Sequence, residues 1–155
     1  DVYKRQIKIR FYPEKAPETC RNFIKLAKAH FYDQSQFHLI IPDVLIQGGS
    51  PGSEINGGPG YFIKAEFNDL PNIQGAVGMA RGSHPDSAGS QFYICLTRIP
   101  ERDRKYTIFG QVEQGLKTAE EISHQESIES EELPGFEQPQ RPIYIKTVEI
   151  IPGGE

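Results

Sequence analysis

The sequence has little cysteine, no surplus of positive charge and no long apolar run, and each shortage excludes a class of protein. Its two cysteines, Cys20 and Cys95, lie far apart. They fit neither a disulfide framework nor a paired metal-ligand spacing, so we expect two buried thiols in a reducing compartment. With 17 Lys and Arg against 21 Asp and Glu, the net charge is −4, and we expect no nucleic-acid partner. No apolar run approaches the ~18 residues of a membrane-spanning helix, so we expect no membrane partner.

The histidines and serines show no pattern typical of a metal site or a hydrolase. The four histidines are His30, His38, His84 and His124. They have no metal-ligand spacing with one another or with the cysteines, so we expect no metal. No nucleophile-elbow pattern surrounds Ser87 or Ser90. The stretch GGPG at 57–60 has no lysine after it and opens no helix, which argues against a phosphate-binding loop.

The length and the spacing of proline and glycine predict one domain made mostly of strands. A chain of 155 residues suits one domain, and we expect a single domain over 1–155. Its 12 prolines and 15 glycines divide it into short segments, which is typical of strands. Apolar Ile7, Ile9 and Phe11 alternate with polar residues, which predicts a half-buried strand. Further strands are expected near 36–41, 44–47, 61–64, 76–80, 91–96, 107–112 and 143–151.

Two helices and two long loops complete this prediction. From Pro17 to Phe31 the apolar residues recur at helical spacing, and proline suits a first helical turn. A shorter helix fits Leu116–Ser123. The glycine- and proline-rich stretch 48–60 is expected to be a loop, and the acidic stretch 124–141 a solvated loop. Many strands with only two helices predict an all-β barrel or sandwich that has helices at its ends.

One predicted strand combines an amide with an aromatic ring on the same face. In SAGSQFYICL the alternation places Gln91, Tyr93 and Cys95 on one face and apolar residues on the other. Gln47 lies similarly at a strand end, before two glycines. Two amides beside an aromatic ring can hold a peptide, with the ring against an apolar side chain and the amides on backbone carbonyls. The alternative, that both glutamines only tie down loop backbone, is equally compatible with the spacing.

Several further blocks of sequence follow one another between about residues 7 and 151. They are RFYPEKAPETCRNFIKLA, FH-IIP---IQGG, GGPGY, NIQGAVGMAR, SAGSQFYI and TIFGQV. Together they resemble the cyclophilin-type peptidyl-prolyl isomerases, particularly compact single-domain bacterial or archaeal members. The resemblance implies a closed antiparallel β-barrel of eight strands, capped by a helix at each end. It also implies catalysis of rotation about X–Pro bonds, without a cofactor, in proline-containing peptides and unfolded or flexible proteins, which assists protein folding.

The resemblance further implies a groove that holds the proline and its flanking backbone. The catalytic positions would be His38, Gln47 and Leu39, the last standing at the position of the family's arginine. The substrate-binding positions would be Val44, Leu45, Ala80, Arg81, Gln91, Tyr93, Arg102 and Tyr106. Gln47 would bind the substrate carbonyl region, and Ala80 would lend backbone hydrogen bonds. Tyr93 would replace a phenylalanine beneath the proline ring.

Leu39 is the departure from the family that bears most on activity. The family's arginine donates to the prolyl nitrogen as the amide twists, against an uncatalysed barrier of ~18–20 kcal/mol. Leucine offers no such donor, and Arg81 or Arg102 stays open as a surrogate. Val44 and Leu45 replace a phenylalanine–methionine pair, which leaves a wider but still apolar pocket.

The amino end also departs from the family. The family's first strand precedes the strand that starts here at Ile7, and only DVYKRQ is present to supply it. This stretch does not resemble the family, so residues 1–6 are doubtful as native sequence. We expect the first strand to be missing or replaced, which would leave unpaired backbone groups on its neighbours.

Two functions of different classes follow. The first is a peptidyl-prolyl cis-trans isomerase with reduced turnover, and the alternative is a non-catalytic module that binds proline segments in the same groove. A third possibility is a scaffold that uses the acidic stretch 124–141 as its contact surface. We expect a monomer in the cytoplasm, while a periplasmic or secreted protein stays open because the native start is not identified in the sequence.

Overall fold

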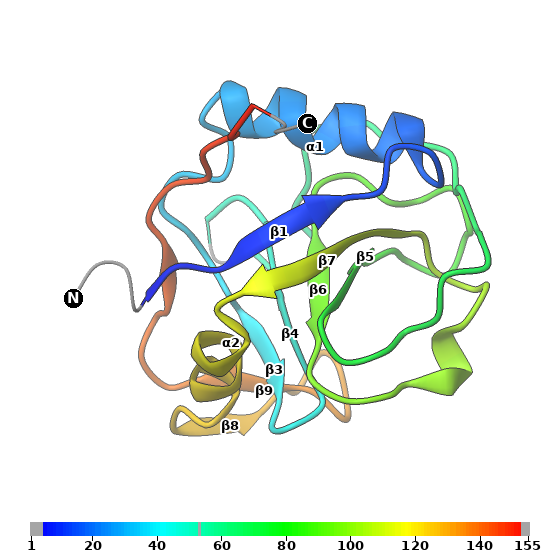
Figure 1. Ribbon diagram of the computed structural model, residues 1–155. Coiled ribbons are helices and arrows are strands. Elements are labelled where there is room, and N and C mark those ends of the chain that lie inside the picture. The colour runs from blue at the N-terminus through cyan, green and yellow to red at the C-terminus, as the bar shows by residue number, and fades with distance from the viewer. Residues whose placement is uncertain (1–4, 53, 153–155) are drawn as a thin grey trace.

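The computed structural model describes residues 5–52 and 54–152. Its helices are α1 (Pro17–Lys28), the 3-10 helix η2 (Pro100–Arg102) and α2 (Leu116–Ser123). Its strands are β1 (Lys8–Phe11), β2 (Ser35–Gln36), β3 (Leu39–Ile41), β4 (Leu45–Gly48), β5 (Ala76–Met79), β6 (Phe92–Cys95), β7 (Ile108–Gln114), β8 (Ser127–Glu129), β9 (Glu137–Pro139) and β10 (Tyr144–Ile145). Figure 1 shows α1 lying across one end of the sheet and α2 near the opposite end. Both predicted helices are confirmed, and α2 has the predicted bounds.

Eight strands form one antiparallel sheet in the order β1-β7-β5-β6-β4-β3-β9-β8. The predicted closed barrel is wrong, because β1 and β8 are the two edges of this sheet. The stretch 143–151, predicted as a last strand, forms a strand only at Tyr144–Ile145, where it pairs with β2 and not with β1. Among the described residues no strand therefore pairs with both edges. Residues 1–4 of the doubtful amino-terminal stretch lie outside the described part, so the expectation of a missing first strand stays a prediction.

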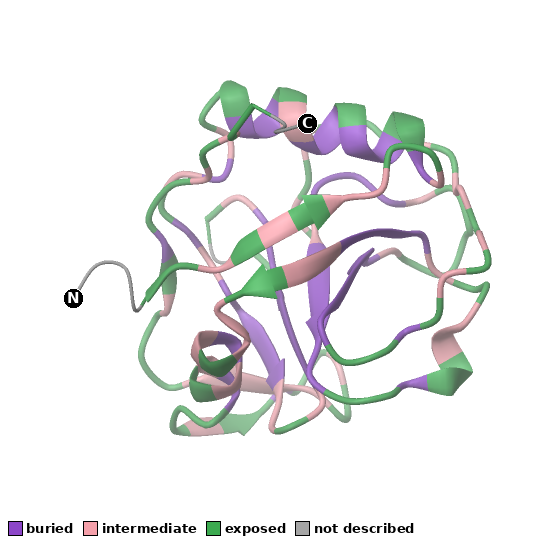
Figure 2. Ribbon diagram, viewed as in Figure 1, coloured by how far each residue is buried: buried purple, intermediate pink, exposed green. Residues whose placement is uncertain are grey.

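Helix α1 covers the larger apolar core. Pro17 is its first residue, and its buried face includes Cys20 and Phe23. Figure 2 shows this buried face turned toward the sheet and the exposed face turned away. The Phe23 ring lies with its centroid 4.9, 5.5 and 5.4 Å from those of Tyr32, Phe92 and Phe109. Contacts among such rings add to the stabilisation from area burial, so the helix is held by aromatic packing.

A smaller apolar cluster lies on the other face of β6. Side chains alternate along β6 as predicted, because Phe92 and Ile94 join the large core and Tyr93 and Cys95 join the smaller cluster. The buried members of the smaller cluster are Leu45, Ala76, Tyr93, Cys95, Ile99 and Ile108. Strand β6 is buried along its whole length (Figure 2). It is thus a central strand with both faces covered, and the candidate site lies beside its smaller cluster.

The acidic stretch 124–141 is largely solvent-accessible, as predicted, but it is not wholly a loop. It forms the hairpin β8–β9, in which Ser127 pairs with Pro139 and Glu129 with Glu137. The hairpin joins the sheet through the pair Ile40 and Glu137 on β3 and β9. Low local hydrophobicity favours a loop. The composition of the stretch does not reveal its pairing with β3, because β3 lies far away in the sequence. The predicted strand at 61–64 is also wrong, since it reduces to one bridge between Ile63 and Ala88.

Candidate active site

A cavity of about 200 Å³ opens beside the smaller apolar cluster. It is lined by Gln47, Ala80, Arg81, Arg102, Tyr106, Leu133 and Phe136. The first five are predicted site residues, which come from β4, the stretch after β5, η2 and the stretch before β7. They meet because β5, β6 and β4 are neighbours in the sheet. A second cavity of about 230 Å³, lined by Gln125, Glu126 and Arg141, contains none of the predicted residues.

The two glutamines are hydrogen-bonded to each other, but one contacts a loop and the other lines the cavity. The Gln91 Nε2 donates to the carbonyl oxygens of Ile55 at 2.8 Å and Gly57 at 2.9 Å. Its Oε1 accepts from Gln47 Nε2 at 3.2 Å. Gln91 therefore ties down the loop after β4, as the alternative interpretation proposed for both glutamines. Gln47 lines the cavity with an amide whose orientation Gln91 sets.

Neither Leu39 nor His38 lines the cavity, although Leu39 lies directly beside Gln47. Leu39 pairs with Gln47 across β3 and β4, so the two side chains share one face of the sheet. The Leu39 side chain is 0% exposed. His38 is buried as well, and burial lowers the pKa of its imidazole. Its ring is therefore neutral at pH 7.

Three other predicted substrate-binding residues form the apolar support behind the cavity. Leu45 and Tyr93 are buried members of the smaller cluster, and Val44 packs against it. The Tyr93 ring is 0% exposed and lies edge-on to Tyr106, with a centroid distance of 5.8 Å. A ligand in the cavity would thus contact Tyr106 directly. Tyr93 would not contact the ligand, but its ring packs against that of Tyr106.

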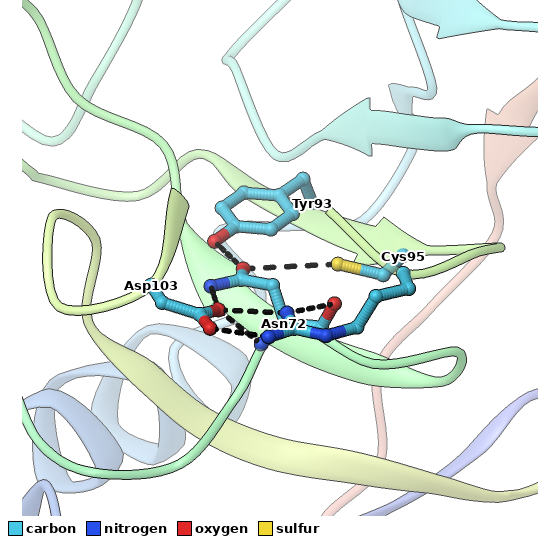
Figure 3. Close-up of polar contacts among 5 residues, drawn as sticks. Asn72, Tyr93, Cys95 and Asp103 are labelled. Carbon is cyan, nitrogen blue, oxygen red and sulfur yellow. Dashed lines mark hydrogen bonds and ion pairs between the residues drawn. The ribbon is translucent and has the colours of Figure 1, made fainter. Parts of the chain in front are cut away.

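The Tyr93 hydroxyl is held by a buried asparagine, Asn72, which sequence analysis did not single out. Tyr93 Oη donates to Asn72 Oδ1 at 2.6 Å, and the Cys95 Sγ lies 3.8 Å from the same oxygen (Figure 3). Burial raises the pKa of Tyr93, and it raises the pKa of the Cys95 thiol to about 12. Both groups therefore stay protonated at neutral pH and act as neutral donors to Asn72.

The same asparagine connects this network to the residue that follows η2. Asn72 donates to Asp103 Oδ1 from its backbone nitrogen at 2.9 Å and from Nδ2 at 3.2 Å. The Arg98 guanidinium donates to both carboxylate oxygens of Asp103, at 2.9 and 2.6 Å. These bonds, first of all that from Arg98, hold the pKa of Asp103 well below its usual range. The network in Figure 3 thus connects the residue that follows η2 to the Tyr93 hydroxyl through Asn72.

Arg102, the last residue of η2, lies over two aromatic rings. Its Cζ is 4.6 Å from the centroid of Tyr93 and 4.5 Å from that of Tyr106, within the range of a cation–π contact. Its Nη1 is buried and has no hydrogen-bond partner. Arg81 lies 4.7 Å from the Tyr106 centroid, and its Nε and Nη2 donate to the Lys105 carbonyl at 2.9 and 2.7 Å. The cavity therefore has two guanidinium groups in its wall.

The tip of the β8–β9 hairpin supplies a wall that sequence analysis missed. Leu133 and Phe136 line the cavity, and Phe136 also packs against the smaller apolar cluster. The backbone turns sharply between them, with Phe136 N donating to Leu133 O at 3.1 Å and Gly135 at φ 94°. Proline followed by glycine at positive φ is typical of a tight turn. In the sequence, a Pro-Gly pair between two apolar residues within an acidic stretch was the signal that could have indicated this turn.

The described part of the chain lacks the features of two other kinds of site. No group of His, Cys, Asp and Glu in 5–52 and 54–152 could hold a metal ion. In the same part of the chain, no helix has the length and apolar character that crossing a bilayer requires.

Comparisons with known proteins identify the family of the chain. The family described as cyclophilin type peptidyl-prolyl cis-trans isomerase/CLD matches residues 2–150. The chain is 42% identical over 113 residues to a peptidyl-prolyl cis-trans isomerase of Synechococcus elongatus, which covers 73% of this chain and 77% of that protein. It is 42% identical over 121 residues to peptidyl-prolyl cis-trans isomerase B of Bacillus subtilis, covering 77% and 84% of the two chains.

A solved structure is similar over nearly the whole chain. The crystal structure of a cyclophilin-type isomerase of Cryptosporidium parvum, determined in the presence of the dipeptide Ala-Pro, matches with a TM-score of 0.86 and 29% identity. The match covers 95% of this chain and 93% of that one. The resemblance of the sequence blocks is thereby confirmed. The chain belongs to the cyclophilin-type peptidyl-prolyl cis-trans isomerases.

Proposed function

We propose that the cavity beside Gln47 binds an X–Pro segment and catalyses its cis-trans isomerisation. The observation that carries this placement is the Gln47 amide, which lines the cavity and is oriented by Gln91 at 3.2 Å. The same cavity is also lined by the apolar side chains of Leu133 and Phe136 and by the Tyr106 ring. An amide can bind a substrate carbonyl, and apolar walls can accept a proline ring. One cavity thus offers both groups that binding of the planar substrate requires, an amide for the carbonyl and apolar walls for the proline ring.

The chemistry requires a group that favours the twisted amide. Resonance makes the barrier ~18–20 kcal/mol, and no covalent bond has to be made or broken. Only an interaction that is stronger in the twisted state than in the planar state speeds the rotation. The prolyl nitrogen becomes a hydrogen-bond acceptor as resonance breaks, so a donor aimed at that nitrogen would meet this condition.

We further propose that turnover is reduced because Leu39 supplies no such donor. Leu39 is fully buried next to Gln47 in the β3–β4 pair. An apolar side chain contacts planar and twisted amides equally, so it contributes nothing to the rate. Removing one preorganised donor typically costs ~10²–10³ in rate. The remaining groups would leave the chain a slow isomerase.

The second candidate function is a module that binds proline segments without turning them over. The same Leu39 favours it, since the cavity walls and Gln47 are sufficient for binding alone. Exchange NMR on one proline peptide separates the two functions, because it reports binding and isomerisation together. Line broadening or exchange peaks between the cis and trans forms, at a rate above the uncatalysed one, would support the isomerase. Shifts that saturate without added exchange would support the binding module.

The same cavity bears on the assembly that activity requires. Its lining already includes Gln47 and apolar side chains, so we infer that a monomer is sufficient for activity. Sedimentation at the concentrations used for the NMR assay tests this inference. Activity that appears only as the chain associates would contradict it.

A further inference from the structure

Arg102 is a cation without an acidic partner, and it stands in the wall of the cavity. Its Nη1 is buried and unpartnered. Among residues 5–52 and 54–152, no ion pair joins its guanidinium to a carboxylate. The neighbouring acid, Asp103, is already bound by Arg98 and by Asn72. A buried polar group normally has a partner, so the missing partner of Arg102 has to be explained.

The position of this guanidinium is set by the fold. Its Cζ lies over two rings, 4.6 Å from the centroid of Tyr93 and 4.5 Å from that of Tyr106. The backbone of η2 is closed by the bond from Arg102 N to Ile99 O at 3.2 Å. The next residue, Asp103, is anchored by the network of Figure 3. The charge is therefore preorganised beside the cavity before any ligand binds.

The cavity lining is positively charged, whereas the chain as a whole is negatively charged. The protein has a net charge of −4, but the residues that line the cavity include two arginines and no acid. The second arginine, Arg81, gives its hydrogen bonds to the backbone carbonyls of Lys105 and Gly82, so its charge is not neutralised there either. Glu131 and Glu132, the acids just before Leu133 on the hairpin tip, are exposed. A ligand that carries a negative charge is thus favoured inside the cavity.

We propose that the cavity selects X–Pro segments with a carboxylate side chain, Glu or Asp, directly before or after the proline, and that Arg102 is the residue that reads this charge. The inference rests on the proposed function and names its substrate class. Arg102 lines the cavity, so a carboxylate held there would accept a charge-assisted hydrogen bond from its guanidinium. Arginine suits this task, since it stays charged and its planar group can stack on a ring while it donates at its edge.

The experiment compares matched peptides that have Glu or Gln at the position before the proline, and a second pair with the change after it. The measurements are kcat/KM by exchange NMR and Kd by titration, on the full chain. We expect a Glu over Gln preference of about tenfold in kcat/KM for at least one pair. Rising salt should reduce this preference, since screening weakens a partly exposed charge pair.

Three variants assign the effect to one side chain. Arg102→Gln should abolish the preference, and Arg102→Lys should retain part of it. Arg104→Gln removes the same charge two residues away at an exposed position outside the cavity lining, and it should leave the preference unchanged. Circular dichroism of each variant establishes that it is folded, and Arg102→Lys keeps the test open if Arg102→Gln does not fold.

Each outcome decides for or against the proposal. Equal values for Glu and Gln peptides in the natural chain would overturn it, as would a preference that survives in Arg102→Gln. A preference only for phosphoserine–proline would overturn the assignment to a carboxylate. If no peptide is isomerised but Glu peptides bind more tightly through Arg102, the selectivity stands and the proposed catalytic function fails.

Discussion

Leu39 and Gln47 lie directly opposite each other on strands β3 and β4, with their side chains on one face of the sheet. Gln47 reaches the cavity, whereas Leu39 is fully buried beside it. The pair combines a polar group that can hold a substrate with an apolar group that cannot favour the twisted amide. Four predictions follow from this arrangement and from the packing around it.

We predict that Leu39→Arg raises the isomerisation rate by about 10²–10³. The guanidinium would offer donors to the prolyl nitrogen only as resonance breaks. Because Leu39 is 0% exposed, the longer charged side chain should also lower the melting temperature. Exchange NMR at equal saturation measures the rate, and Leu39→Met is the matched control that should leave it unchanged. A fast natural rate that Leu39→Arg does not alter would mean that another group already supplies the donor.

We predict that Asn72→Ala destabilises the fold much more than Tyr93→Phe does. The fully buried Asn72 side chain bonds to Tyr93, Cys95 and Asp103, so its loss leaves the buried Tyr93 hydroxyl and Cys95 thiol without this partner, at about 3 kcal/mol. Tyr93→Phe removes a single hydroxyl donor, at about 1 kcal/mol. Urea unfolding measures both changes. Equal losses in the two variants would show that Asn72 does not organise this network.

We predict that Phe136→Ala weakens peptide binding about three- to tenfold, because a cavity wall loses apolar area. The turn that carries Phe136 belongs to the same hairpin as Ile128, which is 57% exposed and does not line the cavity. Ile128→Ala is therefore the control, and it should leave the affinity unchanged. Titration with one proline peptide gives both values. If the two variants bind alike, the hairpin tip is not part of the site.

We predict that part of the stability is lost as the pH falls below about 4, through Asp103. Arg98 first, and then Asn72, lower the pKa of this carboxyl in the folded state, while the unfolded chain protonates near ~3.9. A group with a lowered folded pKa stabilises the fold above its unfolded pKa, and this contribution is lost as the pH falls toward the folded value. The melting temperature should therefore fall less between pH 6 and pH 3 for Asp103→Asn than for the natural chain. Thermal unfolding at the two pH values measures this fall.

The exposed pair of Asp69 and Lys15 is the control for that measurement. Lys15 also lowers the pKa of Asp69, but exposed ion pairs contribute little to stability. Asp69→Asn should therefore change the pH dependence less than Asp103→Asn does. The reverse order would contradict the role assigned to the Arg98–Asp103 pair.

Local patterns in the sequence were sufficient for much of the fold. Helical periodicity located α1 and the bounds of α2, and alternation along β6 separated the residues of the two apolar clusters. The ordered sequence blocks identified the family. The acidic hairpin and the open sheet escaped prediction because each depends on strand pairs between distant segments, such as Ile40 with Glu137. Composition reports a segment's own polarity and says nothing about a partner strand that satisfies its backbone.

For the site, the sequence by itself determined which side chains were available: the two glutamines, the tyrosines, the arginines and the leucine at position 39. Only the tertiary structure decided what each of them contacts. It turned Gln91 toward a loop and Gln47 toward the cavity, and it buried Tyr93 under Arg102. It also brought Leu133 and Phe136 to the cavity from a distant hairpin. The physical reason is that a residue's partners are set by strand order and packing, which bring together groups far apart in the chain.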